Sequence, residues 1–224
     1  AMNQLESQVP DAALRAKLTP DYPIGCRRIL ISDDYFPALM KDNVTLETDG
    51  IETIDATGIQ TSGGHHDLDV IAYATGFETT GWRWSVDVEG RNGQHLNEVW
   101  KDYPEAYLGI TVSDFPNLFV LYGPNTNLGH NAITFMLERQ VEYAVKALDG
   151  LGEAGNAAMV PTQAAQDRFN AQVQADLDKT VWAAPACNSW YKNEHGKITQ
   201  NWSSHTRDYA AAVADVKLED YELI

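Results

Sequence analysis

The stretch "LDVIAYATGFETTGW", residues 68–82, decides the fold of this chain. Its first half is a continuous apolar run, which is typical of a strand buried on both faces of a sheet. It ends at Ala74-Thr75-Gly76, where small side chains and a glycine permit a tight bend. We therefore predict a buried strand over residues 70–74. The bend after it is either an ordinary turn or a place where a large flat ligand comes close to the backbone.

Composition limits the classes of function. The chain has 224 residues, enough for one large domain or two small ones. Lysine and arginine number 16 against 32 acids, and the net charge of −16 predicts no nucleic-acid and no membrane partner. No apolar run reaches the ~18–20 residues that span a bilayer, and no signal peptide opens the sequence. Cys26 and Cys187 fit no metal-ligand spacing, so we expect reduced thiols and a cytoplasmic location.

Hydrophobic periodicity indicates a mixed α/β organisation without the regular β-α-β rhythm of a complete doubly wound sheet. We predict a helical region over residues 4–18, interrupted at Pro10, a helical turn over 34–40, and long helices over 132–151 and 162–182, the second with Pro161-Thr162 as its start signal. On the helix over 132–151, the apolar residues that recur at three- and four-residue steps are Ile133, Leu137, Val141, Ala144, Val145 and Leu148. A further helix is expected to begin the segment 209–224. Short strands are expected over residues 26–32, 43–48 and 118–122, with a small β-meander between Asp49 and the quoted strand.

Three bends carry glycine after a predicted strand or turn: Pro23-Ile24-Gly25, Ala74-Thr75-Gly76 and Tyr122-Gly123-Pro124. Each taken alone is explained by an ordinary turn, since glycine is the usual turn residue. The third is more informative, because a strand, a Gly-Pro-Asn-Thr-Asn-Leu-Gly loop and a helix start follow one another. Such a junction points free amide N–H groups at an electron-rich ligand.

Four segments resemble class B flavoprotein monooxygenases, the Baeyer–Villiger enzymes and their flavin-containing monooxygenase relatives. They are "DYPIGCRRILISDDYFPAL" (21–39), "DVIAYATGF" (69–77), "DFPNLFVLYGPNTNLGHNAITFMLERQVEY" (114–143) and "CNSWYKNEHGKITQNWSS" (187–204). They occur in the family's order and with similar spacings over nearly the whole chain. Four motifs together are considerably more specific than one.

The resemblance implies a partial flavoprotein fold of the type with two dinucleotide-binding domains, combining a small β-meander with long helices. Residues 1–75 would end the NADP domain, and residues 76–224 would form the carboxy-terminal part of the FAD domain. It implies that NADPH reduces a bound FAD, which takes up O2 as a C4a-peroxyflavin. One oxygen atom is then inserted into a ketone or added to the soft nitrogen or sulfur atom of an amine or sulfide.

The resemblance also assigns individual roles. Arg28 would stabilise the anionic peroxyflavin and the ketone adduct through its planar donor fork. Arg27 would bind the 2′-phosphate of NADPH, and Trp190 would contact the nicotinamide side of the cofactor. A surface ion pair remains the alternative for the arginines, and core packing for the tryptophan. The other cofactor-binding candidates are Gly25, Thr75, Gly76, Gly123, Pro124, Asn125, Thr126, Asn127 and Leu128, the last four offering amide N–H groups to the flavin pyrimidine edge.

Other candidate residues carry weaker predictions. His65-His66 is no metal pair, because adjacent side chains on a strand point to opposite faces. Asp33-Asp34 could bind a cation, but closing the preceding strand is the favoured interpretation. His130 lies beside the proposed flavin loop and is given at most an indirect role.

Several family features are missing. No Gly-x-Gly-x-x-Gly stands at a strand–helix turn, and no Phe-x-Gly-x-x-x-His-x-x-x-Trp/Pro fingerprint is present. We therefore expect a carboxy-terminal half that binds FAD and NADP weakly or not at all and is inactive alone. Ala1-Met2 suggests a tag remnant before a start codon, hence a truncated reading frame or a cloned fragment. Sheet edges left open predict a homo-oligomer or a complementing amino-terminal half.

Two alternatives remain at this stage. The chain could be a non-catalytic structural or binding module that retains half of a flavoprotein fold. It could also be half of a pyridine-nucleotide-disulfide reductase, which shares the Ala-Thr-Gly strand. The absence of a Cys-x-x-Cys or Cys-x4-Cys pair argues against this last class, because a redox disulfide of that kind needs two neighbouring thiols.

Overall fold

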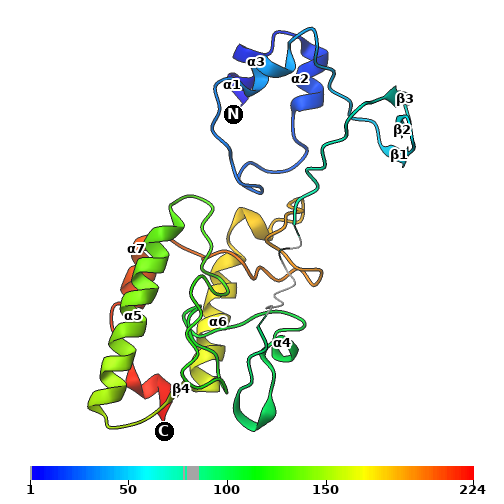
Figure 1. Ribbon diagram of the computed structural model, residues 1–224. Coiled ribbons are helices and arrows are strands. Elements are labelled where there is room, and N and C mark those ends of the chain that lie inside the picture. Colours follow the sequence, from blue (N-terminus) through cyan, green and yellow to red (C-terminus); the bar gives the residue numbers. More distant parts are fainter. Residues whose placement is uncertain (1, 78, 80–85) are drawn as a thin grey trace. The chain divides into compact units, whose positions relative to one another are not determined.

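A computed structural model describes residues 2–77, 79 and 86–224 (Figure 1). It divides the chain into two compact units. Unit 1 comprises residues 1–21 and 30–77, and unit 2 comprises residues 22–29 and 78–224. The boundary therefore follows residue 77, whereas the sequence predicted a division after residue 75, and an eight-residue excursion near the amino terminus joins unit 2. The end of the quoted stretch, at residues 78 and 80–82, lies outside the described residues.

The helices of unit 1 follow the sequence signals. Helices α1 (Met2–Gln8) and α2 (Ala12–Leu18) replace the interrupted helical region, with the break at Pro10. Asp11 caps α2, since its carboxylate accepts hydrogen bonds from the main-chain N–H groups of Ala13 and Leu14. The predicted helical turn is α3 (Tyr35–Leu39).

The predicted β-meander is present in unit 1. Strands β1 (Ile51–Ile54), β2 (Gly58–Thr61) and β3 (Gly64–Asp67) form an antiparallel sheet in sequence order. Gly58 is fixed by space, because a Cβ atom there would lie 1.9 Å from the carbonyl oxygen of His66. Asp55 organises the β1–β2 turn by accepting hydrogen bonds from the Thr57 and Gly58 N–H groups.

The other predicted strands of unit 1 are wrong as paired elements. The predicted strand over residues 26–32, whose first four residues belong to unit 2, and those over 43–48 and 70–74 are not formed. Apolar side chains in these segments reach solvent: Ile31 is 98% exposed and Val70 is 81% exposed. Their patterns are those of buried strands, but a strand is stable only when neighbours pair with it and cover it. The described part of the chain supplies no such neighbour.

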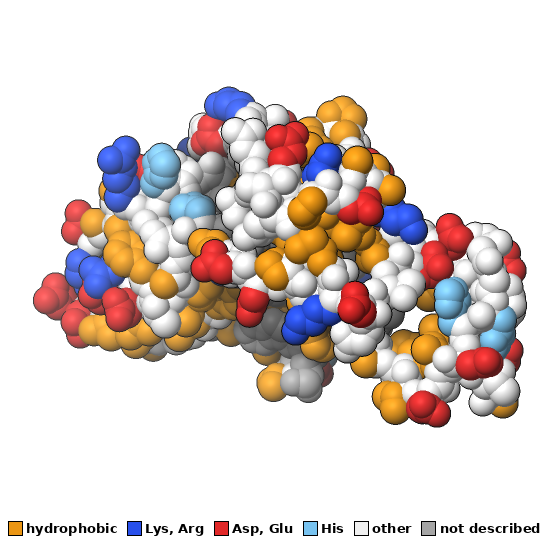
Figure 2. Space-filling model, turned by 90° about the horizontal axis from the view of Figure 1, so that it is seen from above, with side chains coloured by type: hydrophobic (Ala, Val, Ile, Leu, Met, Phe, Trp, Pro, Cys, Tyr) orange, Lys and Arg blue, Asp and Glu red, His pale blue; other side chains and the backbone are white. Residues whose placement is uncertain are grey.

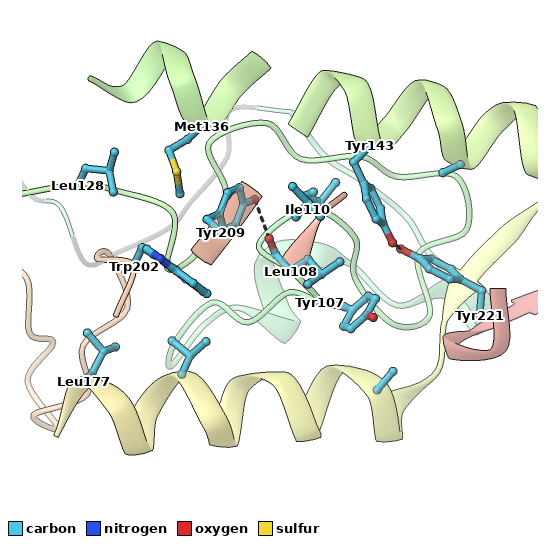
Figure 3. Close-up of a cluster of buried hydrophobic side chains, with 14 of the residues drawn as sticks. Tyr107, Leu108, Ile110, Leu128, Met136, Tyr143, Leu177, Trp202, Tyr209 and Tyr221 are labelled. Carbon is cyan, nitrogen blue, oxygen red and sulfur yellow. Dashed lines mark hydrogen bonds between the residues drawn. The ribbon is translucent and has the colours of Figure 1, made fainter. Parts of the chain in front are cut away.

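Unit 2 contains the main core, between α5 (Ile133–Glu153) and α6 (Gln163–Leu177) (Figure 3). Helix α5 forms as predicted but buries a different face. The recurring apolar residues pointed to Ile133, Leu137, Val141, Ala144, Val145 and Leu148, whereas the buried residues are Met136, Gln140, Tyr143, Ala147 and Leu151. Val141, Val145 and Leu148 are 46%, 53% and 51% exposed. Thr162 caps α6 through a hydrogen bond from the Ala165 N–H group, as the Pro161-Thr162 signal predicted. Helix α7 (Thr206–Ala212) packs beside α5 (Figure 1).

The carboxy terminus closes this core in a way the sequence did not predict. Strand β5 (Tyr221–Leu223) follows the 3-10 helix η3 (Leu218–Asp220) and pairs antiparallel with β4 (Met159–Pro161). The buried Tyr221 hydroxyl lies 2.8 Å from the Tyr143 hydroxyl and 3.0 Å from Thr111 Oγ1 (Figure 3). Among the described residues, no helix is long and apolar enough to cross a bilayer.

A second, smaller core is formed by side chains from residues 96–120, the part of the chain that precedes the loop before α5. It is built around 3-10 helix η1 (Arg91–Gly93) and α4 (Leu96–Val99), and consists of Leu96, Trp100, Ala106, Val112, Phe115 and Val120. The strand predicted over residues 118–122 is wrong. Asn117 and Tyr122 adopt positive φ values of 56° and 61°, and pairing is limited to a single bridge between Thr111 and Phe119.

Candidate functional site

The loop over residues 122–129, between the predicted strand and α5, is fixed by contacts with the side chain of Gln140 and with the backbone of Gly109. Tyr122 adopts a left-handed conformation, and its main-chain N–H donates to the buried Gln140 side chain of α5 at 2.8 Å. Gln140 in turn donates to the Tyr209 hydroxyl of α7 at 2.9 Å. Gly123 lies against Gly109, because a Cβ atom on Gly123 would meet the Gly109 carbonyl oxygen at 2.3 Å. The bare Cα of Gly123 thus serves backbone packing.

The same loop is tied to the segment 198–202. The main-chain N–H groups of Asn125 and Asn127 donate to the carbonyl oxygens of Thr199 and Gln200. Two of the four amides predicted to face a flavin are therefore already engaged, which corrects that part of the prediction. The buried residues Thr126 and Leu128 donate their main-chain N–H groups to none of the described residues. Buried amides are normally satisfied, so these two are available donors for a ligand.

The bend at Gly25 is fastened to the carboxy-terminal aromatic segment. Cys26 and Cys187 form a disulfide, with Cα atoms 5.5 Å apart, so the prediction of reduced thiols is wrong. The two cysteines are 161 residues apart in sequence, and only the fold brings them together. Trp182, in 3-10 helix η2 (Val181–Ala183), donates its indole N–H to the Gly25 carbonyl oxygen at 3.1 Å. Gly25 has a φ of 87°, which favours glycine.

Arg28 emerges from this fastened bend. Arg28 is exposed, and its side chain forms no ion pair with any described carboxylate. The alternative of a surface ion pair therefore does not hold for Arg28. Burial raises the pKa of the Tyr122 and Tyr191 hydroxyls, and the positive charge of Arg28 opposes that rise. Arg28 therefore lies within electrostatic range of both tyrosines. Arg27 instead stacks over the Tyr22 ring, 4.5 Å from its centroid.

The bend at Gly25, the loop over residues 122–129 and the aromatic segment over residues 182–191 form a junction in unit 2. Aromatic side chains surround it. Trp190 is 44% exposed rather than a core residue, and its ring centroid lies 4.3 Å from that of the buried Tyr191. Trp182 contacts Tyr191 edge-to-face and also approaches the loop, where a Cβ atom on Gly129 would meet its ring at 3.1 Å. A hollow of about 480 Å³ lies beside Trp182 and is lined by His130, Thr180, Val181, Trp182, Trp202, Ser203, Ser204 and His205.

The remaining sequence candidates lie elsewhere. Thr75 and Gly76 belong to unit 1, where both are exposed, and a Cβ atom on Gly76 would meet nothing within 4 Å. His65 pairs with Asp55 and Asp67, while His66 pairs with Glu47. In the described part of the chain, no group of three or more histidine, cysteine, aspartate or glutamate side chains is placed to hold a metal ion.

Two further features of unit 1 carry no candidate chemistry. Asp34 stands immediately before α3 without a capping hydrogen bond from its side chain, and it accepts a hydrogen bond from Ser32 Oγ. The strand that Asp33-Asp34 was expected to close is not formed. A larger hollow of about 630 Å³ lies between α2 and residues 39–46, and no candidate side chain lines it.

Comparison with known proteins gives this junction its context. No protein-family model matches the chain. An FAD-binding monooxygenase of Aspergillus niger is 41% identical over 98% of this chain and 37% of its own length. A Baeyer–Villiger monooxygenase of Pseudomonas aeruginosa is 38% identical over 100% of this chain and 43% of its own length. The chain is similar to one part of flavin-dependent monooxygenases.

Solved structures agree. An oxidized steroid monooxygenase bound to NADP has a TM-score of 0.87 and 28% identity over 99% of this chain and 44% of that protein. The structure titled OTEMO complex with FAD and NADP has a TM-score of 0.84 and 30% identity over 99% of this chain and 43% of that protein. These matches confirm the resemblance and the mixed α/β fold with a small antiparallel sheet and long helices. The chain spans about two fifths of the length of these relatives, which is consistent with a carboxy-terminal half.

The residues of unit 2 suit the flavin ring of FAD, but they provide no site for the pyrophosphate of FAD. An unpaired guanidinium, two unengaged buried amides and exposed aromatic rings suit an electron-rich flat ring. The spacing Gly-x-Gly-x-x-Gly does occur once, over residues 150–155, but it lies at the carboxy-terminal end of α5. Gly155, with a φ of 72°, follows the end of that helix. These glycines do not open a helix, so they offer a phosphate no N-terminal amides.

Sequence reasoning missed several residues that shape the site. Gln140 reads as a polar interruption in the apolar face of α5, and Asn201 has no pattern at all. The Asn127 side-chain amide donates to Asn201 Oδ1, and Tyr122 Oη donates to Asn127 Oδ1. The Gln140 interruption was the one available signal, because a polar residue on a buried helix face needs a hydrogen-bond partner.

Proposed function

We propose that this chain forms part of an FAD- and NADPH-dependent monooxygenase that transfers one oxygen atom from O2 to a ketone, or to the nitrogen or sulfur of an amine or sulfide. The observation that carries the proposal is the junction in unit 2. There the unpaired Arg28, the loop over residues 122–129 and the aromatic segment around Trp190 meet. We also propose that unit 1 ends an NADP domain and that unit 2 belongs to an FAD domain.

The chain's own residues have distinct tasks in this proposal. The Arg28 guanidinium stays protonated at any working pH and offers a rigid donor fork to a developing oxyanion. Thr126 and Leu128 donate amide N–H groups to the ring edge, and Trp190 packs on the nicotinamide side. Arg27, exposed beside Tyr22, binds the 2′-phosphate. A bound, reduced flavin supplies the oxygen-transfer chemistry, using hydride from NADPH.

The partner of this chain is part of the proposal. The extended apolar segments of unit 1 leave Leu30, Ile31, Val70, Tyr73 and Phe77 exposed. Figure 2 shows hydrophobic side chains at the surface among acidic ones. Such segments suit pairing with strands of a complementing amino-terminal half, or with a second copy in a homo-oligomer. The net charge of −16 opposes nucleic-acid and anionic-membrane partners.

A cytoplasmic location also stays a proposal. It rested on reduced cysteines, and the Cys26–Cys187 disulfide removes that support. Disulfides are uncommon in cytosolic proteins, where glutathione and thioredoxin keep thiols reduced. Counting free thiols in protein extracted under acid quench would decide the redox state in the cell.

The decisive test is a chimaera in which this chain replaces the matched part of the Pseudomonas aeruginosa relative. We expect the chimaera to bind FAD and to oxidise NADPH in a ketone-dependent manner with formation of an ester. The Arg28→Ala variant should retain bound FAD but lose at least about 10²-fold in turnover, because one preorganised oxyanion donor contributes roughly that factor.

Arg207→Ala is the matched control, since Arg207 is an exposed arginine whose ion pair is with Asp208 of its own helix, α7. It should leave turnover unchanged. A folded, FAD-loaded chimaera without oxygenation of ketones, amines or sulfides would overturn the proposed activity. Equal turnover of the two arginine variants would overturn the role of Arg28. The isolated chain should show no stoichiometric flavin spectrum, because the pyrophosphate cradle is absent from it.

A further inference from the structure

We propose that the Cys26–Cys187 disulfide is a redox-controlled positioning element, which holds Arg28 at the junction when oxidised and releases it when a dithiol reduces it. The inference deepens the proposed function, because its biological meaning depends on Arg28 acting there. Its physical part concerns the attachment of one segment and can be tested without any cofactor.

The segment 22–29 is an excursion of the chain. The residues before it and after it both belong to unit 1, whereas the segment itself belongs to unit 2. Among the described residues, one hydrogen bond joins it to the rest of unit 2, from the Trp182 indole N–H to the Gly25 carbonyl oxygen. The second link between this segment and the rest of unit 2 is the Cys26–Cys187 disulfide, which is covalent. The Cys26 N–H bond to the Pro23 carbonyl oxygen is internal to the segment and fastens it to nothing else.

Arg28 depends on this attachment. It lies two residues after Cys26, and no described carboxylate pairs with it. Its place within electrostatic range of Tyr122 and Tyr191 therefore follows from where the backbone is fastened, and not from a bond of its own side chain. Cleaving the disulfide leaves one neutral hydrogen bond, worth only about 0.5–1.5 kcal/mol net in general, to hold eight residues that gain considerable conformational entropy on release.

The chemistry balances with a dithiol as the reductant. Its thiolate attacks one Sγ atom, the S–S bond breaks, and the other cysteine leaves as a thiolate that takes up a proton. The second thiol of the reductant then displaces the first cysteine and closes its own disulfide. Two electrons and two protons pass to the protein, giving two Cys–SH groups. Cys26 and Cys187 are buried, whereas Ala186 and Asn188 beside Cys187 are exposed, so local opening of this surface segment gives the reductant access to the bond.

Trypsin cleavage reads out the attachment. Trypsin cuts after Arg27 and Arg28 and needs several flanking residues in an extended, detached conformation. We expect cleavage at these two bonds to be about tenfold or more faster after reduction with dithiothreitol, because detachment of the segment then requires only local opening. Cleavage after Lys217, an exposed residue of the same unit that makes no described hydrogen bond with residues 22–29, is the internal control and should change little.

Serine variants complete the test. Cys26→Ser and Cys187→Ser should each show the fast cleavage without reductant and no further response to it. Far-ultraviolet circular dichroism and the Lys217 cleavage rate show whether a variant remains folded. Reduction of the unsubstituted chain needs no variant and tests the same attachment if one fails to fold. Thiol alkylation followed by mass spectrometry should find no free thiol before reduction and two after it.

Two results would overturn the inference. Free Cys26 and Cys187 thiols in protein purified without reductant would show that the disulfide does not form. An intact disulfide whose reduction leaves the Arg27 and Arg28 cleavage rates unchanged relative to Lys217 would show that it positions nothing. Neither result depends on flavin. A segment that responds to reduction in a chimaera without oxygenase activity would sink the proposed function and leave the attachment standing.

Discussion

Unit 1 and unit 2 use similar sequence patterns to different effect. Both contain apolar runs that read as buried strands and amphipathic runs that read as helices. In unit 2 the helices α5, α6 and α7 enclose a core in which Met136, Tyr143 and Leu177 are fully buried. In unit 1 the buried hydrophobic residues are few, among them Leu5 and Val9, while Leu30, Ile31 and Val70 are exposed.

The difference shows that an amphipathic helix and a buried strand depend on their surroundings in different ways. A helix forms its backbone hydrogen bonds internally and needs a partner for one face only. A central strand needs a neighbour on each edge and a cover on each face. Unit 2 finds its partners within the chain. The extended apolar segments of unit 1 around Ile31 and Val70 do not, and this is why we propose that another chain supplies their partners.

The largest expected effect tests whether stability resides in unit 2. Leu177→Ala removes a fully buried side chain from α6 and should lower the free energy of unfolding by about 2–5 kcal/mol, measured by urea denaturation. Leu30→Ala is the matched control in unit 1. Because Leu30 is already exposed, its truncation should change the free energy by no more than about 0.5 kcal/mol. Equal losses for the two variants would contradict the contrast between the units.

A smaller effect is expected at the polar centre of unit 2. Gln140→Leu deprives the Tyr122 N–H of its acceptor and the Tyr209 hydroxyl of a donor, which should cost about 1–3 kcal/mol. Gln172→Leu on the exposed face of α6 is the control and removes one hydrogen bond, to Asp176. Amide hydrogen exchange should accelerate over residues 122–128 in the first variant only. Unchanged exchange there would show that Gln140 does not fix the loop.

Local patterns predicted most of the helices. The Asp11 and Thr162 caps, the break at Pro10 and the spacing of α5 are all encoded within a few residues. The meander was predicted for the same reason, since its turns carry Asp, Gly and Thr at short intervals. The strands at residues 70–74 and 118–122 were wrong, because pairing partners are a property of the whole fold and not of the segment.

The site divides in the same way. Arg28 and the loop over residues 122–129 were found by family resemblance, and unit 2 brings them together. The disulfide and the engaged amides of Asn125 and Asn127 were not predicted. Each joins residues 70 or more positions apart, so no local pattern could reveal it. Gly123 was read as making room for a ligand, but the room is taken by the Gly109 backbone.

The exposed apolar segments of unit 1, which form no strands in this chain, offer a test of the proposed partner. Val70→Lys places a charge on an extended apolar segment and should weaken self-association or binding of a complementing half by about tenfold, measured by light scattering or sedimentation. Val86→Lys in unit 2 is the control, since Val86 is also an exposed valine but lies outside these segments. A monomeric chain that binds no complementing half would remove the basis for this surface.

The smallest expected effect concerns a polar network of unit 1, the β1–β2 turn around Asp55. Hydrogen bonds from the Thr57 main chain and side chain, with further ones from Gly58 and His65, lower the pKa of Asp55 from 3.8 to about 2. Because the pKa is depressed in the folded state, the stabilisation is fully present above about pH 4 and is lost as the pH falls towards 2. Nuclear magnetic resonance titration of the Asp55 carboxyl group and of the hairpin amides should show this range. Asp55→Asn keeps an acceptor for the Thr57 and Gly58 N–H groups, so the turn should persist without the acid transition, whereas Asp55→Ala should loosen it at every pH. An Asp55 pKa near 3.8 would mean that the turn opens in solution, and that unit 1 lacks even this locally stabilised element.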